Sequence, residues 1–173
     1  MAEKVVSRIE RAELSSTEAA PTLAIKNFLA AMESDDSLFR IAQPLAGPAA
    51  DESSGGRVYS GDAVLEFRQA EHRSQRTVHF LLLEKLTELL KEAGSREALE
   101  VTLCLTSASI PTSHSEVQSK PDPRELALWL RLDATGDSPE QAVLRWGLGL
   151  AHIQQALLFT SRHLRLHMAH AGN

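Results

Sequence analysis

Apolar residues recur around most of the circumference of one segment, SPEQAVLRWGLGLAHIQQALL, at residues 138–158. Steps of three and four residues are typical of an α-helix, and the Ser-Pro-Glu-Gln start is the pattern of a capped N-terminus. We therefore predict a long C-terminal helix with two apolar sides. Its main stripe consists of Val143, Trp146, Leu150, Ile153, Leu157 and Leu164, and beside or behind it lie Leu144, Leu148, Ala151 and Leu158.

Two environments explain a helix of this kind. In the first, it is a central helix that lies between a sheet and residues 22–41. In the second, it forms a homodimer interface, in which the stripe packs against its two-fold mate. Gly147 and Gly149 each weaken a helix by about 1 kcal/mol relative to Ala, which favours the close approach of another backbone. The residues expected at the interface are Val143, Trp146, Leu150, Ile153 and Leu157.

Helical spacing occurs in three further segments. Residues 77–94 carry leucines at helical positions and end in Gly94, a residue typical of helix ends. A second amphipathic pattern has Pro21 near its start and is followed by the polar run SDDS. Residues 3–14 indicate a shorter amphipathic helix.

Alternating apolar and polar residues indicate two strands, ALEVTLCLTSASI at residues 98–110 and ELALWLRLD at residues 125–133. We expect them to be antiparallel neighbours. Their serine-rich connection, at residues 107–124, is interpreted as a variable surface loop, or as a segment that binds a partner or accepts phosphate. In RVYSGDAVLEFRQ, Gly61-Asp62 predicts a hairpin turn, with a helix capped by Ser60 as the alternative.

Composition divides the chain into an N-terminal helical segment (residues 1–43), a flexible linker (44–56) and an α+β core domain (57–173). The linker, PLAGPAADESSGG, is rich in turn-forming residues, and an ordinary surface loop is the other interpretation. The predicted fold class is α+β: a small antiparallel sheet packed against two or three helices, with a long C-terminal helix. Over residues 57–165, this order of elements resembles that of small acidic dimeric chaperones, such as those of bacterial type III secretion, without a shared motif.

The 173 residues carry a formal net charge of -5, which favours neither a nucleic-acid partner nor an anionic membrane surface. The acidic N-terminal part and the basic C-terminal helix, with Arg162 and Arg165, suit two interpretations: attraction within or between chains, or charges placed for solubility and helix ends. No apolar run reaches the roughly 20 residues that cross a bilayer, and the N-terminus lacks a signal-peptide pattern. The single cysteine, Cys104, is expected to pack inertly in its strand, and it suits a cytoplasmic protein without an internal disulfide.

Motifs for catalysis are missing from the sequence: it contains no Gly-rich phosphate loop, no Gly-x-Ser-x-Gly elbow and no Cys-x-x-Cys pair. His163, His167 and His170 share one face of a helix and are candidates for a metal site. The competing interpretation is that histidines suit the negative end of a helix. No cofactor is predicted, and these patterns favour a non-enzymatic protein.

The leading hypothesis is a non-enzymatic protein–protein interaction module: an adaptor, a chaperone or a complex subunit. It dimerises through the C-terminal helix and binds a partner protein, as a homo-oligomer or as part of a hetero-complex. The alternative is a small enzyme or ligand-binding domain with a pocket between the sheet and the helices. Its polar groups would include His79, His152, Trp129 or Arg131.

Overall fold

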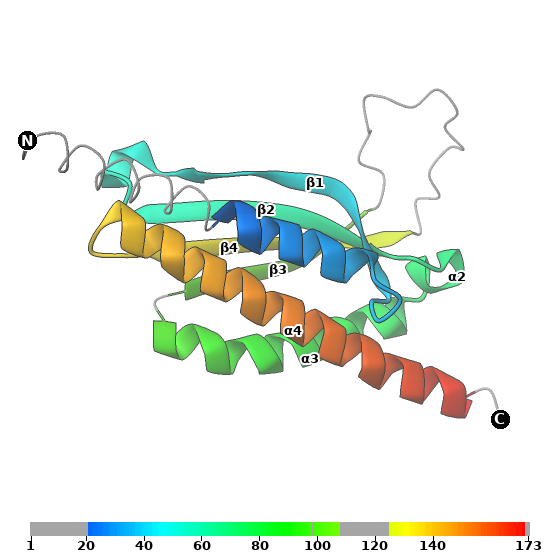
Figure 1. Ribbon diagram of the computed structural model, residues 1–173. Helices are drawn as coiled ribbons and strands as arrows, with labels where there is room; N and C mark the ends of the chain where they lie inside the picture. The colour runs from blue at the N-terminus through cyan, green and yellow to red at the C-terminus, as the bar shows by residue number, and fades with distance from the viewer. Residues whose placement is uncertain (1–20, 98, 108–124, 172–173) are drawn as a thin grey trace, which may run out of the picture.

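The computed structural model describes residues 21–97, 99–107 and 125–171, with the side chains of residues 43–48, 92–97, 107 and 167–171 excepted. A four-stranded antiparallel sheet is covered on one face by helices (Figure 1). The prediction of an α+β fold with a small antiparallel sheet and a long C-terminal helix is confirmed. The helix predicted at residues 3–14 and the connection predicted after residue 107 lie outside the described residues.

The chain begins its described part with a helical stretch, residues 21–33. The sheet has the order β1-β2-β4-β3, so β1 and β3 form its edges. Helix α4 crosses the sheet with residues 21–33 on one side and α3 on the other (Figure 1). The elements are β1 (Phe39–Ala50), the 3-10 helix η1 (Glu52–Ser54), β2 (Val58–Phe67), α2 (Ala70–Arg73), α3 (Arg76–Glu97), β3 (Leu99–Ser107), β4 (Leu126–Thr135) and α4 (Pro139–Ala171).

Strands β3 and β4 confirm the alternation that predicted them. They are antiparallel neighbours in unbroken register, from Leu99 opposite Ala134 to Ser107 opposite Leu126. The buried apolar residues of β4 belong to the core cluster that the helices complete, and the apolar set of β3 packs against that cluster. We call this the inner face of the sheet and the opposite side the outer face.

Strand β2 corrects the predicted hairpin. Gly61 and Asp62 lie in the middle of this strand and pair with β4, so the chain does not turn there. The turn between β1 and β2 contains Gly55 and Gly56 instead, with φ angles of 66° and 77°. Glycine adopts this left-handed conformation without the steric penalty of a side chain. The hairpin turn therefore lies at the end of the predicted linker.

The prediction of a flexible linker at residues 44–56 is wrong for residues 44–50. Residues 44–50 belong to β1, which pairs with β2 along its length, although the pairing contains three register shifts. Backbone pairing with a neighbouring strand overrides the loop-like composition, because strand preference depends strongly on context. The helical stretch before β1 joins the same core, since Phe28 and Met32 are both 0% exposed.

Helix α3 confirms the helix predicted at residues 77–94. It continues to Glu97, so Gly94 is not its terminator. Its inner side buries Leu82 and Leu86, which are 1% and 0% exposed. The helix therefore supplies one flank of the core, on the side of the sheet that ends with β3.

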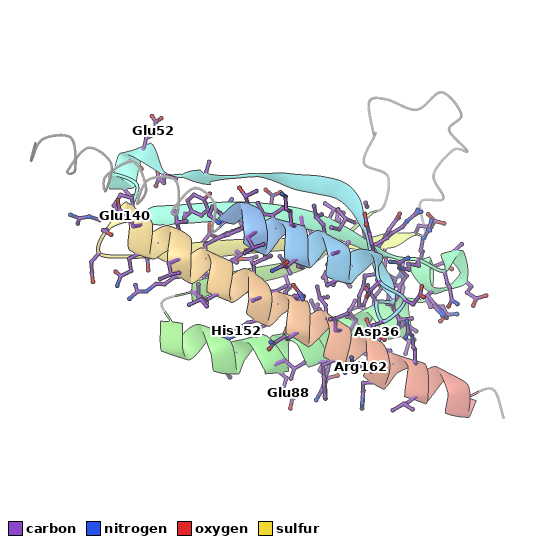
Figure 2. All side chains as sticks on the ribbon, viewed as in Figure 1. Asp36, Glu52, Glu88, Glu140, His152 and Arg162 are labelled. Atoms are coloured by element: carbon purple, nitrogen blue, oxygen red, sulfur yellow. The ribbon has the colours of Figure 1, made fainter. Side chains whose placement is uncertain are left out.

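The second half of α4 holds the turn that follows residues 21–33. The Ser161 hydroxyl accepts a hydrogen bond from the Leu38 N–H at 3.1 Å. Arg162 lies 3.7 Å from Asp36 (Figure 2), and Arg165 donates to a main-chain carbonyl of the same turn. One ion pair between the acidic N-terminal part and the basic helix therefore lies within the chain.

Candidate functional site

Helix α4 begins at Pro139, as its capping pattern predicts. The Ser138 hydroxyl accepts the N–H of Gln141 at 3.3 Å, and the Gln141 side chain accepts the N–H of Asp137 at 2.6 Å. A hydrogen bond from Ser138, together with a backbone N–H, lowers the pKa of Glu140, which lies at this end of the helix (Figure 2). These contacts set the start of the helix and therefore which of its faces meets the sheet.

The inner side of α4 lies against the sheet. Trp146 is 0% exposed, donates its ring N–H to the Leu132 carbonyl at 3.1 Å and meets the Tyr59 ring edge-on at 5.5 Å. Gly149 allows a close approach here, because an added Cβ would lie 3.1 Å from side-chain atoms of Leu132 and Leu99. The approaching groups are side chains rather than the backbone expected from the sequence.

This packing corrects the location of the predicted interface. Four of its five residues are core side chains, with exposed fractions of 0–1%. They are therefore not a surface that a second chain could reach while the fold is intact. The stripe therefore packs on the sheet, as in the first of the two predicted environments, but residues 21–33 lie beside α4 and do not cover its other side. The four core residues are Trp146, Leu150, Ile153 and Leu157; only Val143 is partly exposed.

The other side of α4 carries a second set of large apolar residues that stays exposed. They recur at steps of 4, 11 and 7 residues, which place them within about 60° of one another around a helix of 3.6 residues per turn. Side chains of this size at such exposure, on one helix face, are typical of a contact surface. We call this set the outer stripe: Leu144 (58% exposed), Leu148 (48%), Phe159 (52%) and Leu166 (62%).

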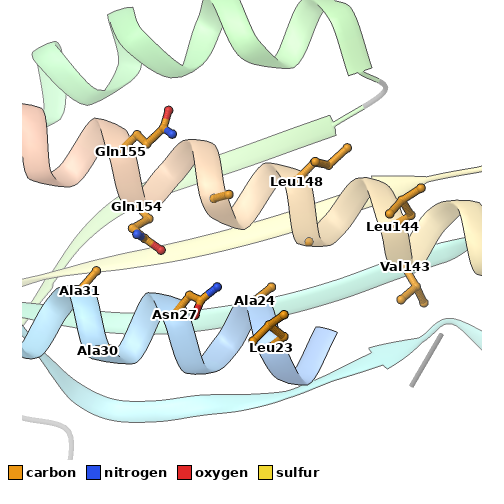
Figure 3. Close-up of a pocket in the computed structure, with 12 residues that line it drawn as sticks. Leu23, Ala24, Asn27, Ala30, Ala31, Val143, Leu144, Leu148, Gln154 and Gln155 are labelled. Atoms are coloured by element: carbon orange, nitrogen blue, oxygen red, sulfur yellow. The ribbon is translucent and has the colours of Figure 1, made fainter. Parts of the chain in front are cut away.

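A groove of about 700 Å³ runs between α4 and residues 21–33, beside the first half of the outer stripe (Figure 3). Small residues line much of it, among them Ala24 and Gly147, where an added Cβ would lie 3.8 Å from the Ala24 Cβ. Leu144 and Leu148 stand at its side, so projecting and recessed apolar surfaces lie next to each other (Figure 3). We call this feature the groove.

The four residues predicted to serve a ligand pocket do not converge. His79 is buried, with its two ring nitrogens 3.0 and 3.1 Å from the carbonyl oxygens of Gln75 and Leu126, so it links the start of α3 to β4. Trp129 and Arg131 project from the outer face, away from the helices. There they contact Asp62 and Asp133 at 3.2 and 3.0 Å. His152 lies on α4 (Figure 2). Alternation along β4 thus separates these groups by the thickness of the sheet.

Metal binding gains no support from the described part of the chain. No group of three or more His, Cys, Asp or Glu residues there could hold a metal ion. His163 is exposed on α4, whereas the side chains of His167 and His170 lie outside the description. Cys104 is exposed on the outer face, opposite Trp129, which corrects the expectation of an apolar packing position.

The sequence identified half of the outer stripe: Leu144 and Leu148 belong to the predicted second apolar side, whereas Phe159 and Leu166 were not singled out and Leu158 packs against the core. The pattern did not show which side the sheet would cover, because both sides have helical spacing. The groove could not be predicted, since it depends on the distance between α4 and a helical stretch more than a hundred positions away.

The described helices include none that is long and apolar enough to cross a membrane. Comparisons of the chain with protein-family models, with curated proteins and with solved structures find no match in any of the three. The resemblance of element order to type III secretion chaperones therefore stays a prediction, and the function must be argued from the surfaces described above.

Proposed function

We propose that this chain is a non-enzymatic protein–protein interaction module that forms a homodimer through the outer stripe and the groove. The observation that carries the proposal is the row of half-exposed leucines and phenylalanine on α4, a helix whose opposite side is already buried in the core. The proposed dimer interface is still on the C-terminal helix, as the sequence favoured, but it lies on the face opposite the predicted one.

Shape supports a second copy of this chain as the occupant. A two-fold interface is self-complementary, so each surface must carry both projections and the hollows that receive them. Leu144 and Leu148 are projections, and the small residues at Gly147 and Ala151 leave hollows on the same face. Two copies related by a two-fold axis along this face can each place leucines in the other's groove.

The polar lining of the groove also suits a buried interface. Its polar side chains are Asn27, Gln154 and Gln155, all uncharged. Interface cores are depleted of charged residues because ions lose hydration when they are buried. Amide side chains can instead exchange hydrogen bonds across a two-fold axis without a net charge.

Within this proposal, the dimer is the form that presents binding sites to a partner protein, as an adaptor, a chaperone or a complex subunit would. A cytoplasmic location remains the prediction that accompanies it. Cys104 is an exposed free thiol, and a reducing compartment keeps such a thiol from forming disulfides between chains.

Size exclusion with light scattering tests the proposal across a range of protein concentrations. Leu148→Glu places a charge on the outer stripe and should convert the dimer into a folded monomer. Leu81→Glu on α3 is the matched control: both leucines are 48% exposed, and Leu81 does not line the groove. Circular dichroism checks that both variants stay folded. A wild-type protein that is monomeric throughout, or two variants with the same mass as the wild type, would contradict the proposal.

A further inference from the structure

The two edges of the sheet differ in how well they are protected against pairing. Edge β1 contains Pro44 and Pro48 and has three register shifts against β2. Prolines lack the N–H that pairing needs, and irregular register twists an edge away from a new strand. Edge β3 contains no proline and pairs with β4 over nine consecutive residues without a shift. Within the described sheet, only β3 therefore offers a regular edge.

The inner side of β3 is also less covered than that of its neighbour. On β4, Leu130 and Leu132 are each 1% exposed, whereas Val101 and Leu103, opposite them on β3, are only partly buried. A groove of about 510 Å³ lies between this edge and α3, where Leu90 and Lys91 form the far wall. An additional strand beside β3 would place every second side chain in this groove.

The outer side of the same edge carries charged side chains. Glu100 projects there, and a hollow beside it is lined by Asp51, Asp133 and Arg131. Arg131 is already bound to Asp133 at 3.0 Å. Three carboxylates and one arginine therefore give this part of the outer face an excess of two negative charges.

We propose that β3 binds an extended segment of a partner protein as a fifth strand, with apolar side chains directed at α3 and a basic side chain beside Glu100. Backbone N–H and C=O groups on a free edge bind another strand, and pockets for alternate side chains supply specificity. The site is distinct from the proposed dimer surface on α4 and does not depend on it.

Charge also argues against a second copy as the occupant of this edge. The sequence of β3, LEVTLCLTS, contains no basic residue. A second β3 would therefore bring no positive charge to the acidic hollow. A heterologous segment with lysine or arginine on its outward side matches the edge better, because opposite charges on neighbouring strands attract.

The probe for this site is the fluorescein-labelled nonapeptide SVKVTVTVS, in which valines alternate with lysine and threonines. Binding is measured by fluorescence anisotropy on the Leu148→Glu variant, so that dimerisation on α4 does not interfere. Two further peptides carry backbone N-methyl groups, one on all valines and one on the lysine and threonines. Because alternate N–H groups point to opposite edges of a strand, one methylated peptide should bind at least tenfold more weakly and the other should bind as before.

Glu100→Lys tests the charge preference. This variant should bind the lysine peptide roughly two- to fivefold more weakly and should favour a peptide with glutamate in place of lysine, as expected for one cross-strand ion pair. Glu84→Lys on α3 changes the net charge equally, is also exposed, and does not line the β3 groove; it should leave binding unchanged.

Three results would overturn the proposal. One is no binding of the unmethylated peptide at millimolar concentration. Another is equal binding of both methylated peptides, which would exclude pairing through one edge. The third is a Leu148→Glu protein that is still dimeric and is dissociated by the peptide, since β3 would then pair with a second copy of the chain.

Discussion

The two sides of α4 carry similar residues in very different surroundings. Leu150 on the inner side is 1% exposed, and Leu148, two residues earlier on the outer side, is 48% exposed. Both sides follow helical spacing, so the difference arises from which side the sheet and α3 cover. Apolar spacing in a helix thus identifies surfaces that need a partner, and the tertiary fold decides whether that partner is the chain's own core or another molecule.

The largest expected effect is the difference in unfolding free energy between truncation of Leu150 and truncation of Leu148. Leu150→Ala should lower the free energy of unfolding by about 2–5 kcal/mol, because it leaves a cavity in the core. Leu148→Ala should change it by about 0.5 kcal/mol or less in dilute protein, as is usual for exposed positions. Urea unfolding measures both values. Equal losses would mean that the two sides are buried alike, and the comparison would fail.

The next effect concerns the contact between the inner side of α4 and the start of β1. Ser161 donates to the Leu157 carbonyl at 2.8 Å and accepts from the buried Leu38 N–H. Ser161→Ala leaves that N–H without its acceptor, at a cost of about 1–3 kcal/mol. Thr87→Ala is the control, since its hydroxyl makes the same bond to a carbonyl four residues earlier, but on an exposed site. Urea unfolding should show little change for the control; a similar loss in both variants would remove the role assigned to Leu38.

The two glycines of α4 allow a comparison in which a smaller change in stability is expected. Gly147→Ala should stabilise the monomer by about 0.5–1 kcal/mol, because alanine favours the helix and the new Cβ would meet Ala24 at 3.8 Å, an ordinary contact. Gly149→Ala has the same helix preference, but its Cβ would lie 3.1 Å from Leu132 and Leu99. It should therefore be less stable than Gly147→Ala by about 1 kcal/mol or more. Thermal unfolding of the two variants tests this order, which equal stabilities would contradict.

The smallest effect is expected at the start of α4. The pKa of Glu140 is lowered from 4.5 in the folded chain, first by its hydrogen bond with Ser138. A carboxyl with a lowered folded pKa stabilises the protein above its ordinary pKa, and this contribution is lost as the pH falls through the lowered value. Glu140→Gln should therefore be slightly less stable than the wild type at pH 7 and equal to it in strong acid. An unchanged difference in urea unfolding at both pH values would contradict this assignment.

Alternation, helical spacing and the N-terminal capping pattern of α4 were reliable guides to local structure, whereas Gly94 did not end its helix. They predicted β3, β4, α3 and the start of α4, because in these segments the local preference agrees with the final environment. Residues 44–50 are an exception: their prolines, glycine and alanines suggest a linker, yet Ala46, Ala49 and Ala50 pair with β2. The hairpin turn predicted at Gly61-Asp62 is wrong for a related reason: these turn-forming residues lie in the middle of a paired strand, where the chain does not turn.

The candidate surfaces depend on information that local patterns do not contain. The stripe with the strongest anchor, Trp146, was expected at an interface and lies in the core. A tryptophan suits either place, because it buries a large area and needs one hydrogen-bond acceptor, here supplied by Leu132. The position of β3 at an edge of the described sheet depends on the strand order, which alternation within one strand does not reveal.

The most direct test of the central claim is the dependence of the thermal unfolding midpoint on protein concentration. Association through the outer stripe stabilises the folded state by mass action, so the wild-type midpoint should rise by roughly 3–5 °C over about a hundredfold increase in concentration. Leu148→Glu should unfold at a midpoint that does not change over the same range, whereas Leu81→Glu should behave like the wild type. A wild-type midpoint that is independent of concentration would contradict the claim that the outer side of α4 joins two copies of this chain.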